Sequence, residues 1–251
     1  PILPDASKEF LPYLMLISVI GIIYGALVAM MQKDMKKLVA YSSVSHLGFC
    51  MLGVFVATPV ALEGGILQMI NHGISTGALF MIVGIIYERR HTRLISDYSG
   101  LSQIMPMYAI VFLIMTLSSI GMPMLNGFIG EFMILQGVFA DPEYRLWAIF
   151  GASGIVLGAA YMLWLYQRVM FGEVEQEENK LMPDLNLREL ASFAPLVVLA
   201  FWIGLYPKTF LDYLHEPVNQ IVEKVRPGEF EALPASAESR GVIDGRTATN
   251  R

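Results

Sequence analysis

The sequence contains a single cysteine, Cys50, among 251 residues. One thiol excludes a disulfide framework, a four-thiolate iron–sulfur cluster and a cysteine-rich zinc site within the chain. The sequence also lacks the glycine-rich G-x-G-x-x-G and Walker-type loops that cradle nucleotide phosphates. Any redox chemistry that the protein serves is therefore expected to take place elsewhere.

Charged residues are scarce as well. They make up 16% of the chain, whereas soluble domains carry about 25%, and 55% of the residues are hydrophobic. The uncharged runs are Leu11–Gln32, Leu38–Leu62, Gly64–Tyr87, Ile104–Gly130, Leu146–Gln167 and Leu190–Pro207. Each approaches or exceeds the roughly 20 residues that cross a hydrocarbon core about 30 Å thick. The sequence therefore predicts an all-α membrane protein with a bundle of six transmembrane helices, because the buried helices of a soluble protein rarely lack charge on every face.

Composition also predicts the organisation along the chain. We expect a periplasmic loop at 1–10, a transmembrane bundle at 11–212, an amphipathic interfacial helix at 213–225 and a disordered tail at 226–251. The expected spans are about 11–31, 37–58, 64–87, 105–140, 145–168 and 190–207. Because the chain opens without Met or a signal peptide, we expect it to be a fragment that begins in a loop.

Basic residues set the expected orientation. Nine lie near one face of the membrane: Lys33, Lys36, Lys37, Arg89, Arg90, Arg93, Arg168, Lys180 and Arg188. Three lie near the other face: Lys8, Arg145 and Lys208. The positive-inside rule places the first group in the cytoplasm.

The fourth span cannot be one straight helix. From 105 to 140 it is too long for a single crossing, and Gly121, Pro123 and Gly127 favour a break near 121–127. Glu131 follows the break, where the helix dipole favours a carboxylate and burial favours the neutral acid. We interpret Glu131 as a proton site with switchable protonation; the alternative is a proline kink with a hydrogen-bonded structural glutamate.

Two histidines lie on polar helix stripes. His46 follows Ser42 and Ser45, and the next span carries the stripe Gln68, Asn71, His72, Ser75 and Thr76. An imidazole can take a proton on one nitrogen and release it from the other, so these residues are candidates for a proton relay with Glu131. The alternatives are packing residues with satisfied hydrogen bonds, or a metal site formed by His46, His72 and Glu131.

Other ionisable residues offer weaker candidates. Lys36 is a possible entrance to the relay, although it can equally set topology by reaching the membrane surface. His91 and His215 fall outside the predicted spans and are expected to be solvated.

Four separated motifs carry a family resemblance: Gln32–Gly48, Asn71–Gly73, Tyr87–Arg93 and Gly130–Phe132. Together they resemble the antiporter-like membrane subunits of respiratory complex I, the NADH:quinone oxidoreductase. Within that family the resemblance is to the M subunits, because L and N subunits and cation/proton antiporters usually carry Lys where this chain has Glu131. The family has about fourteen spans with two inverted five-helix repeats, so the resemblance implies a C-terminal half: the second repeat plus the final helix.

The resemblance also implies a function. The chain would belong to a proton translocase of the bacterial inner membrane, with Glu131 as the terminal carboxylate and His46 and His72 on the central polar axis. It implies no cofactor in this chain; NADH, FMN, iron–sulfur clusters and quinone are expected in partner subunits. The expected partners are other complex I membrane subunits, especially L and N, and the lipid bilayer, with no nucleic acid. The Glu–Lys pair and further lysine of the family's first repeat have no counterpart here.

Two other functions stay open. One is a subunit of a multisubunit cation/proton antiporter, which sodium-dependent transport would indicate. The other is a structural membrane segment without a proton path, in which Glu131→Gln would leave pumping intact.

Overall fold

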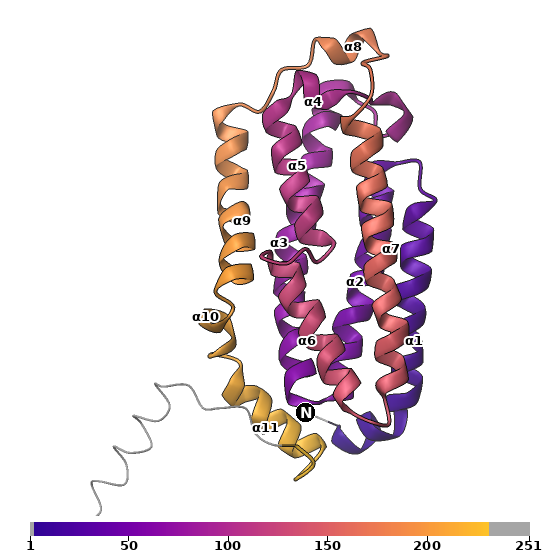
Figure 1. Cartoon of the computed structure of the whole chain (residues 1–251), viewed down its shortest axis with the longest axis vertical. Helices are drawn as coiled ribbons and strands as arrows, with labels where there is room; N and C mark the ends of the chain where they lie inside the picture. Colours follow the sequence, from indigo (N-terminus) through magenta and orange to yellow (C-terminus); the bar gives the residue numbers. More distant parts are fainter. Residues whose placement is uncertain (1–2, 231–251) are drawn as a thin grey trace, which may run out of the picture.

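The computed structural model describes residues 3–230 (Figure 1). Its helices are α1 (Pro4–Met30), α2 (Met35–Val56), α3 (Pro59–Arg90), the 3-10 turn η1 (Ile95–Asp97), α4 (Leu101–Ile104), α5 (Pro106–Ser119), α6 (Asn126–Ala140), α7 (Arg145–Met170), α8 (Glu177–Lys180), α9 (Leu187–Leu205), α10 (Lys208–Leu211) and α11 (His215–Val225). Of these, α1, α2, α3, α7 and α9 are each long and apolar enough to cross a membrane. Figure 1 shows α6 continuing below α5 as the second half of a sixth crossing. The predicted all-α bundle of six spans is confirmed.

Local sequence explains where the long helices begin. The Asp34 side chain accepts the backbone N–H of Lys37 at the start of α2, and Thr58 caps α3 in the same way. Asn186 and Glu189 form a capping box at the start of α9. Each cap satisfies backbone donors that a helix start leaves free.

Some helix ends differ from the expected spans. Helix α1 begins at Pro4, so most of the segment predicted as a loop at 1–10 is helical. Helix α3 begins at Pro59 rather than near 64, because Pro59 fits the first helical turn behind the Thr58 cap. This start brings Glu63 into the helix. The interfacial helix predicted at 213–225 corresponds to α11, and most of the tail predicted at 226–251 lies outside the described residues.

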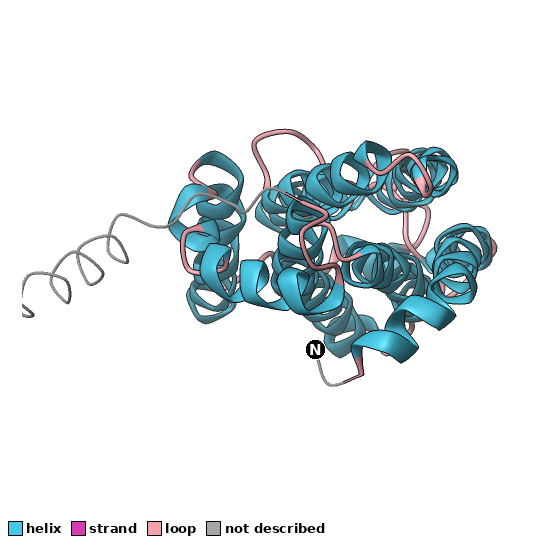
Figure 2. Cartoon of the chain, turned by 90° about the horizontal axis from the view of Figure 1, so that it is seen from below, coloured by secondary structure: helices cyan, strands magenta, loops and turns pink. Residues whose placement is uncertain are grey.

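The two larger apolar clusters of the bundle lie one toward each of its two ends. The basic end carries Lys36, Arg89 and Arg93; its core includes Tyr108, Phe112 and Tyr161 from α5 and α7. The opposite end carries α11 and the start of α1, and its core joins α1, α2, α6 and α7. Figure 2, viewed from the opposite end, shows the helices packed side by side. Buried polar residues of α2, α3, α5 and α6 lie between the two clusters.

Candidate functional site

The break between α5 and α6 is an ordered turn at mid-bundle. Gly121 has φ of 71° and Met124 has φ of 77°, both in the left-handed region. A Cβ at Gly127 would lie 2.1 Å from the backbone oxygen of Ser118, so only glycine lets the start of α6 lie this close to the end of α5. Backbone strain and close approach at one place are typical of functional sites.

Side chains of α3 form hydrogen bonds with Ser118 and Asn126 on the two sides of the break. Asn71 Nδ2 donates to the backbone oxygen of Asn126 at 2.8 Å, and Asn126 Nδ2 donates back to the Asn71 oxygen at 3.3 Å. Ser118 Oγ donates to Asn126 Oδ1 at 2.5 Å and lies 2.6 Å from Ser75 Oγ. Irregular backbone at membrane depth needs such partners, because hydrocarbon offers none.

Glu131 lies in the second turn of α6 with its carboxylate buried. Its Oε1 lies 3.0 Å from His46 Nδ1 and accepts a hydrogen bond from Gln68 Nε2 at 3.1 Å. Its Oε2 faces Gly121, where a Cβ would come within 2.7 Å. The carboxylate therefore touches α2, α3 and the break itself.

His46 joins this carboxylate to a row of polar groups. Its Nε2 lies 3.4 Å from Ser119 Oγ, and its ring centroid is 5.4 Å from that of His72. His72 is half-buried on α3, with Nδ1 3.0 Å from Thr76 Oγ1. The three predicted relay residues thus lie in one cluster, in the order Glu131, His46, His72.

A small cavity lies within the cluster. Its volume is about 10 Å³. The lining residues are His46, Gln68, Asn71, His72, Ser75, Ser118, Ser119 and Gly127. A volume of this order holds one water. Hydroxyl, amide and imidazole groups line it, so a water there has polar partners for proton transfer.

Lys36 lies apart from this cluster. It is exposed at the basic end and lines a pocket of about 440 Å³ with Phe80, Val83, Gly84, Tyr87 and Arg93. Ten residues of α2 separate it from His46, about 15 Å along the helix. Its role as a relay entrance stays a prediction. Among residues 3–230, no group of three His, Cys, Asp or Glu side chains is arranged to hold a metal ion.

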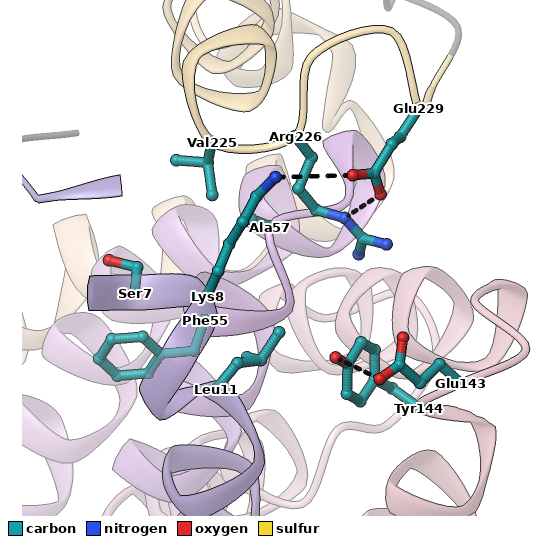
Figure 3. A pocket seen from close by; sticks show the side chains of 10 residues that line it. All are labelled: Ser7, Lys8, Leu11, Phe55, Ala57, Glu143, Tyr144, Val225, Arg226 and Glu229. Carbon is teal, nitrogen blue, oxygen red and sulfur yellow. Dashed lines mark hydrogen bonds and ion pairs between the residues drawn. The ribbon is translucent and has the colours of Figure 1, made fainter. Parts of the chain in front are cut away.

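Ion pairs at the opposite end hold the segment after α11 against the bundle; Figure 3 shows the contacts of Glu229 with Lys8 and Arg226. Arg226 pairs with the buried Asp141 at 2.7 Å and with Glu229 at 2.6 Å, and it donates to the Val56 backbone oxygen at 3.1 Å. Burial alone would lower the pKa of Arg226, but its hydrogen bonds to Asp141 and Glu229 raise it. Arg226, Glu229 and Lys8 contribute to the lining of a pocket of about 170 Å³.

Sequence reasoning did not find two features of the structure. Ser118, Ser119 and Asn126 complete the cluster. The available signal was that these polar residues flank the break on both sides. His215, expected to be solvated, is instead mostly buried and pairs with Glu63 of α3. That correction follows from the start of α3 at Pro59, which places Glu63 inside the bundle rather than in a loop.

Comparison with known proteins gives consistent relatives. Residues 1–158 match the family described as "NADH:quinone oxidoreductase/Mrp antiporter, TM". A curated relative, NADH-quinone oxidoreductase subunit M of Rhodobacter capsulatus, is 43% identical over 224 residues, covering 89% of this chain and 43% of the relative. The chain thus spans less than half the length of that protein.

Solved structures agree in fold. A chain of respiratory complex I from Thermus thermophilus with bound NADH superposes with a TM-score of 0.82 at 33% identity, covering 88% of this chain and 46% of the other. A chain of the Mrp complex from Dietzia sp. DQ12-45-1b gives a TM-score of 0.76 at 20% identity, covering 89% and 49%. At 20% identity, the similarity to the Mrp chain supports only a shared fold.

Proposed function

The chain belongs to the NADH:quinone oxidoreductase/Mrp antiporter transmembrane family, and from this premise we propose that it is the proton-translocating part of a membrane subunit of NADH:quinone oxidoreductase. The observation that carries the proposal is a buried carboxylate, Glu131, bound to an imidazole, His46, beside a break in a transmembrane helix. An ionisable pair at this depth is costly in lipid and is typical of ion pathways.

The cluster supports a proton transfer in two balanced steps. In the first step the neutral ring of His46, with its proton on Nδ1, takes up a second proton at Nε2 from the side of Ser119 and the small cavity and becomes an imidazolium. In the second step Nδ1–H passes to Glu131 Oε1, which leaves a neutral acid and a neutral imidazole protonated at Nε2. The ring then returns to the Nδ1–H tautomer and can donate again, because an imidazole takes up and releases protons at different nitrogens.

His72 extends this path away from Glu131. Its ring lies against that of His46, and the same helix has open space at Gly73 and Gly77, where a Cβ would meet nothing within 4 Å. We therefore assign His72 to the side of the path on which protons arrive, and retain Lys36 as a candidate entrance at the basic end.

The overall reaction belongs to the assembled complex. NADH oxidation and quinone reduction in other subunits would drive the transfer, with FMN and iron–sulfur clusters there and no cofactor in this chain. The basic end would face the cytoplasm and α11 the periplasm, in a bacterial inner membrane. Neighbouring antiporter-like subunits of the L and N type are the proposed partners.

A cation/proton antiporter subunit is the second candidate, because the family includes Mrp antiporters and the Mrp chain shares the fold. Glu131 argues against it, since those proteins usually carry Lys at this place. Sodium distinguishes the two: the main proposal expects the same proton transport with sodium or potassium as the only cation, and the antiporter expects a sodium requirement.

The test uses the complete complex in liposomes, with quinone reduction and acidification measured together. Glu131→Gln keeps the size and hydrogen bonds of the side chain but cannot release a proton. We expect it to lower the number of protons moved per electron, as should His72→Ala, while Glu173→Gln in an exposed loop keeps the wild-type ratio. Wild-type ratios and rates in both relay variants would contradict the proposal. The chain would then be a structural membrane segment without a proton path.

A further inference from the structure

A second buried carboxyl group lies nearer the opposite end of the bundle. Glu63 sits in the second turn of α3, and its Oε1 is in contact with Nδ1 of His215, the first residue of α11. His215 Nε2 in turn lies 3.6 Å from Asp212 Oδ1. One imidazole thus bridges two carboxylates, and each of its nitrogens faces one of them.

These three side chains form a row from the interior to the surface. The exposed fractions are 2% for the Glu63 side chain, 14% for His215 and 35% for Asp212. The cationic Lys208 lies beside the outer member, with Nζ 3.9 Å from Asp212 Oδ2. A buried carboxyl group, an imidazole in contact with it and a solvent-exposed carboxyl group thus lie in spatial order. Such an arrangement can conduct protons between the interior and the solvent.

Helix α11 holds the row in place. Val218 and Val222 of α11 are buried against Leu62, the neighbour of Glu63 on α3. At the other end of α11, Arg226 binds Asp141 and the Val56 backbone oxygen. His215 is therefore fixed by packing on both sides and does not depend on Glu63 alone for its position.

The shortest route from Glu131 to the surface, along α6, passes through closely packed helices. A Cβ at Gly137 would lie 2.4 Å from the Ala61 nitrogen, and one at Gly53 would lie 2.6 Å from the Ala61 oxygen. Ala61, Ile134 and Val138 around them are fully buried. Backbones in contact and apolar side chains leave water no room between α2, α3 and α6 around Ala61, on the surface side of Glu63.

We propose that Glu63, His215 and Asp212 form the port through which a proton from Glu131 leaves the bundle at the end opposite the basic loops. Glu63 accepts the proton and passes it to Nδ1 of the neutral His215 ring, whose own proton is on Nε2. The imidazolium then gives its Nε2–H to Asp212, which releases the proton to the solvent. The ring returns from the Nδ1–H to the Nε2–H tautomer, so that every group regains its starting charge and protonation. The proposal rests on the function proposed for Glu131.

Depth along the helices fits this order. Glu131 lies nine residues before the end of α6, about 13.5 Å, and Glu63 lies four residues after the start of α3, about 6 Å. Gln68, which donates to Glu131, lies five residues along α3 from Glu63, about 7.5 Å. Glu63 is thus intermediate in depth between Glu131 and the surface.

The test measures protons released per electron by the complete complex in liposomes. We expect Glu63→Gln and His215→Gln to show the same loss as Glu131→Gln, and Glu63→Asp, which keeps a titratable carboxyl group, to restore transport. Lys224→Gln is the matched control, because Lys224 is exposed on α11 and is not part of the row; it should keep the wild-type ratio.

Each other outcome overturns the port, and two of them separate it from the proposed function. A wild-type ratio in Glu63→Gln and His215→Gln, beside a loss in Glu131→Gln, removes the port and keeps the relay. A wild-type ratio in Glu131→Gln removes the relay, and the port with it. An equal loss in Lys224→Gln, or a loss that Glu63→Asp does not restore, would show that the row is only a structural contact between α3 and α11. If Glu63→Gln does not assemble, His215→Gln and Asp212→Asn give the same decision.

Discussion

Gly121 lies directly against the carboxylate of Glu131: a Cβ at position 121 would come within 2.7 Å of Glu131 Oε2. The same glycine has φ of 71°, which an L side chain rarely adopts. The turn that interrupts the transmembrane helix is therefore in direct contact with the carboxylate of Glu131.

Gly121→Ala should impair both stability and proton transfer. The left-handed backbone costs alanine about 1–2 kcal/mol, and the methyl group pushes the carboxylate away from its contacts with His46 and Gln68. We expect a lower midpoint of thermal denaturation of the purified complex together with fewer protons per electron. A variant with the wild-type proton ratio would show that the position of Glu131 at this contact is not critical.

A matched pair of glycines in α1 tests the close approach of helices. A Cβ at Gly25 would lie 2.8 Å from the Ser45 nitrogen, whereas one at Gly21 would meet its nearest atom at 3.9 Å. Gly25→Ala should separate α1 from α2 beside His46 and lower the thermal midpoint, and Gly21→Ala should leave it unchanged or raise it, since alanine favours the helix. Equal midpoints in the two variants would contradict this difference in packing.

The two asparagines that close the break should be energetically coupled. Each donates its side-chain N–H to the other's backbone oxygen, so each substitution removes one of two reciprocal buried hydrogen bonds. A double-mutant cycle of Asn71→Ala and Asn126→Ala should give a coupling free energy of about 0.5–3 kcal/mol in unfolding measurements. Strict additivity would mean that the break is held by other contacts.

Arg226 and Lys8 offer a contrast between a buried and an exposed ion pair. Arg226→Gln leaves Asp141 buried without its partner, which typically costs about 3–5 kcal/mol. Lys8→Gln removes an exposed contact with Glu229, 3.8 Å long, which contributes about 0–1 kcal/mol. Limited proteolysis of the α11 segment should therefore accelerate in the first variant only. Similar rates in both would show that the Asp141 pair does not anchor α11.

The sequence predicted the parts of the site that follow from helical spacing. The break at Gly121–Gly127 follows from Pro123 and from a span too long for one crossing, and the stripe from Gln68 to Thr76 places its residues on one face of α3. Which face meets Glu131 depends on how α2, α3 and α6 pack, so spacing along the chain could not predict the contacts of His46 and Gln68 with the carboxylate.

Glu63 and His215 show why other parts escaped prediction. Glu63 separates two uncharged runs, which suggested a loop, and only the Thr58 cap with Pro59 signals that the helix begins earlier. His215 is 152 residues away in the chain, and the amphipathic pattern of α11 predicts a surface helix without saying which element it covers. A lysine at the end of α2, such as Lys36, can be either a topology signal or a proton entrance. Its spacing along the chain could not decide between these roles, or show that it lies apart from the cluster.

Infrared difference spectroscopy tests the central claim most directly, because the C=O stretch of a protonated carboxyl group reports the acid itself. Spectra of the complex at rest and during NADH oxidation should contain a carboxyl band that changes with turnover, shifts in deuterated water and disappears in Glu131→Gln. The same band in wild type and Glu131→Gln, or a Glu131 band that does not change during turnover, would show that Glu131 does not carry the proton.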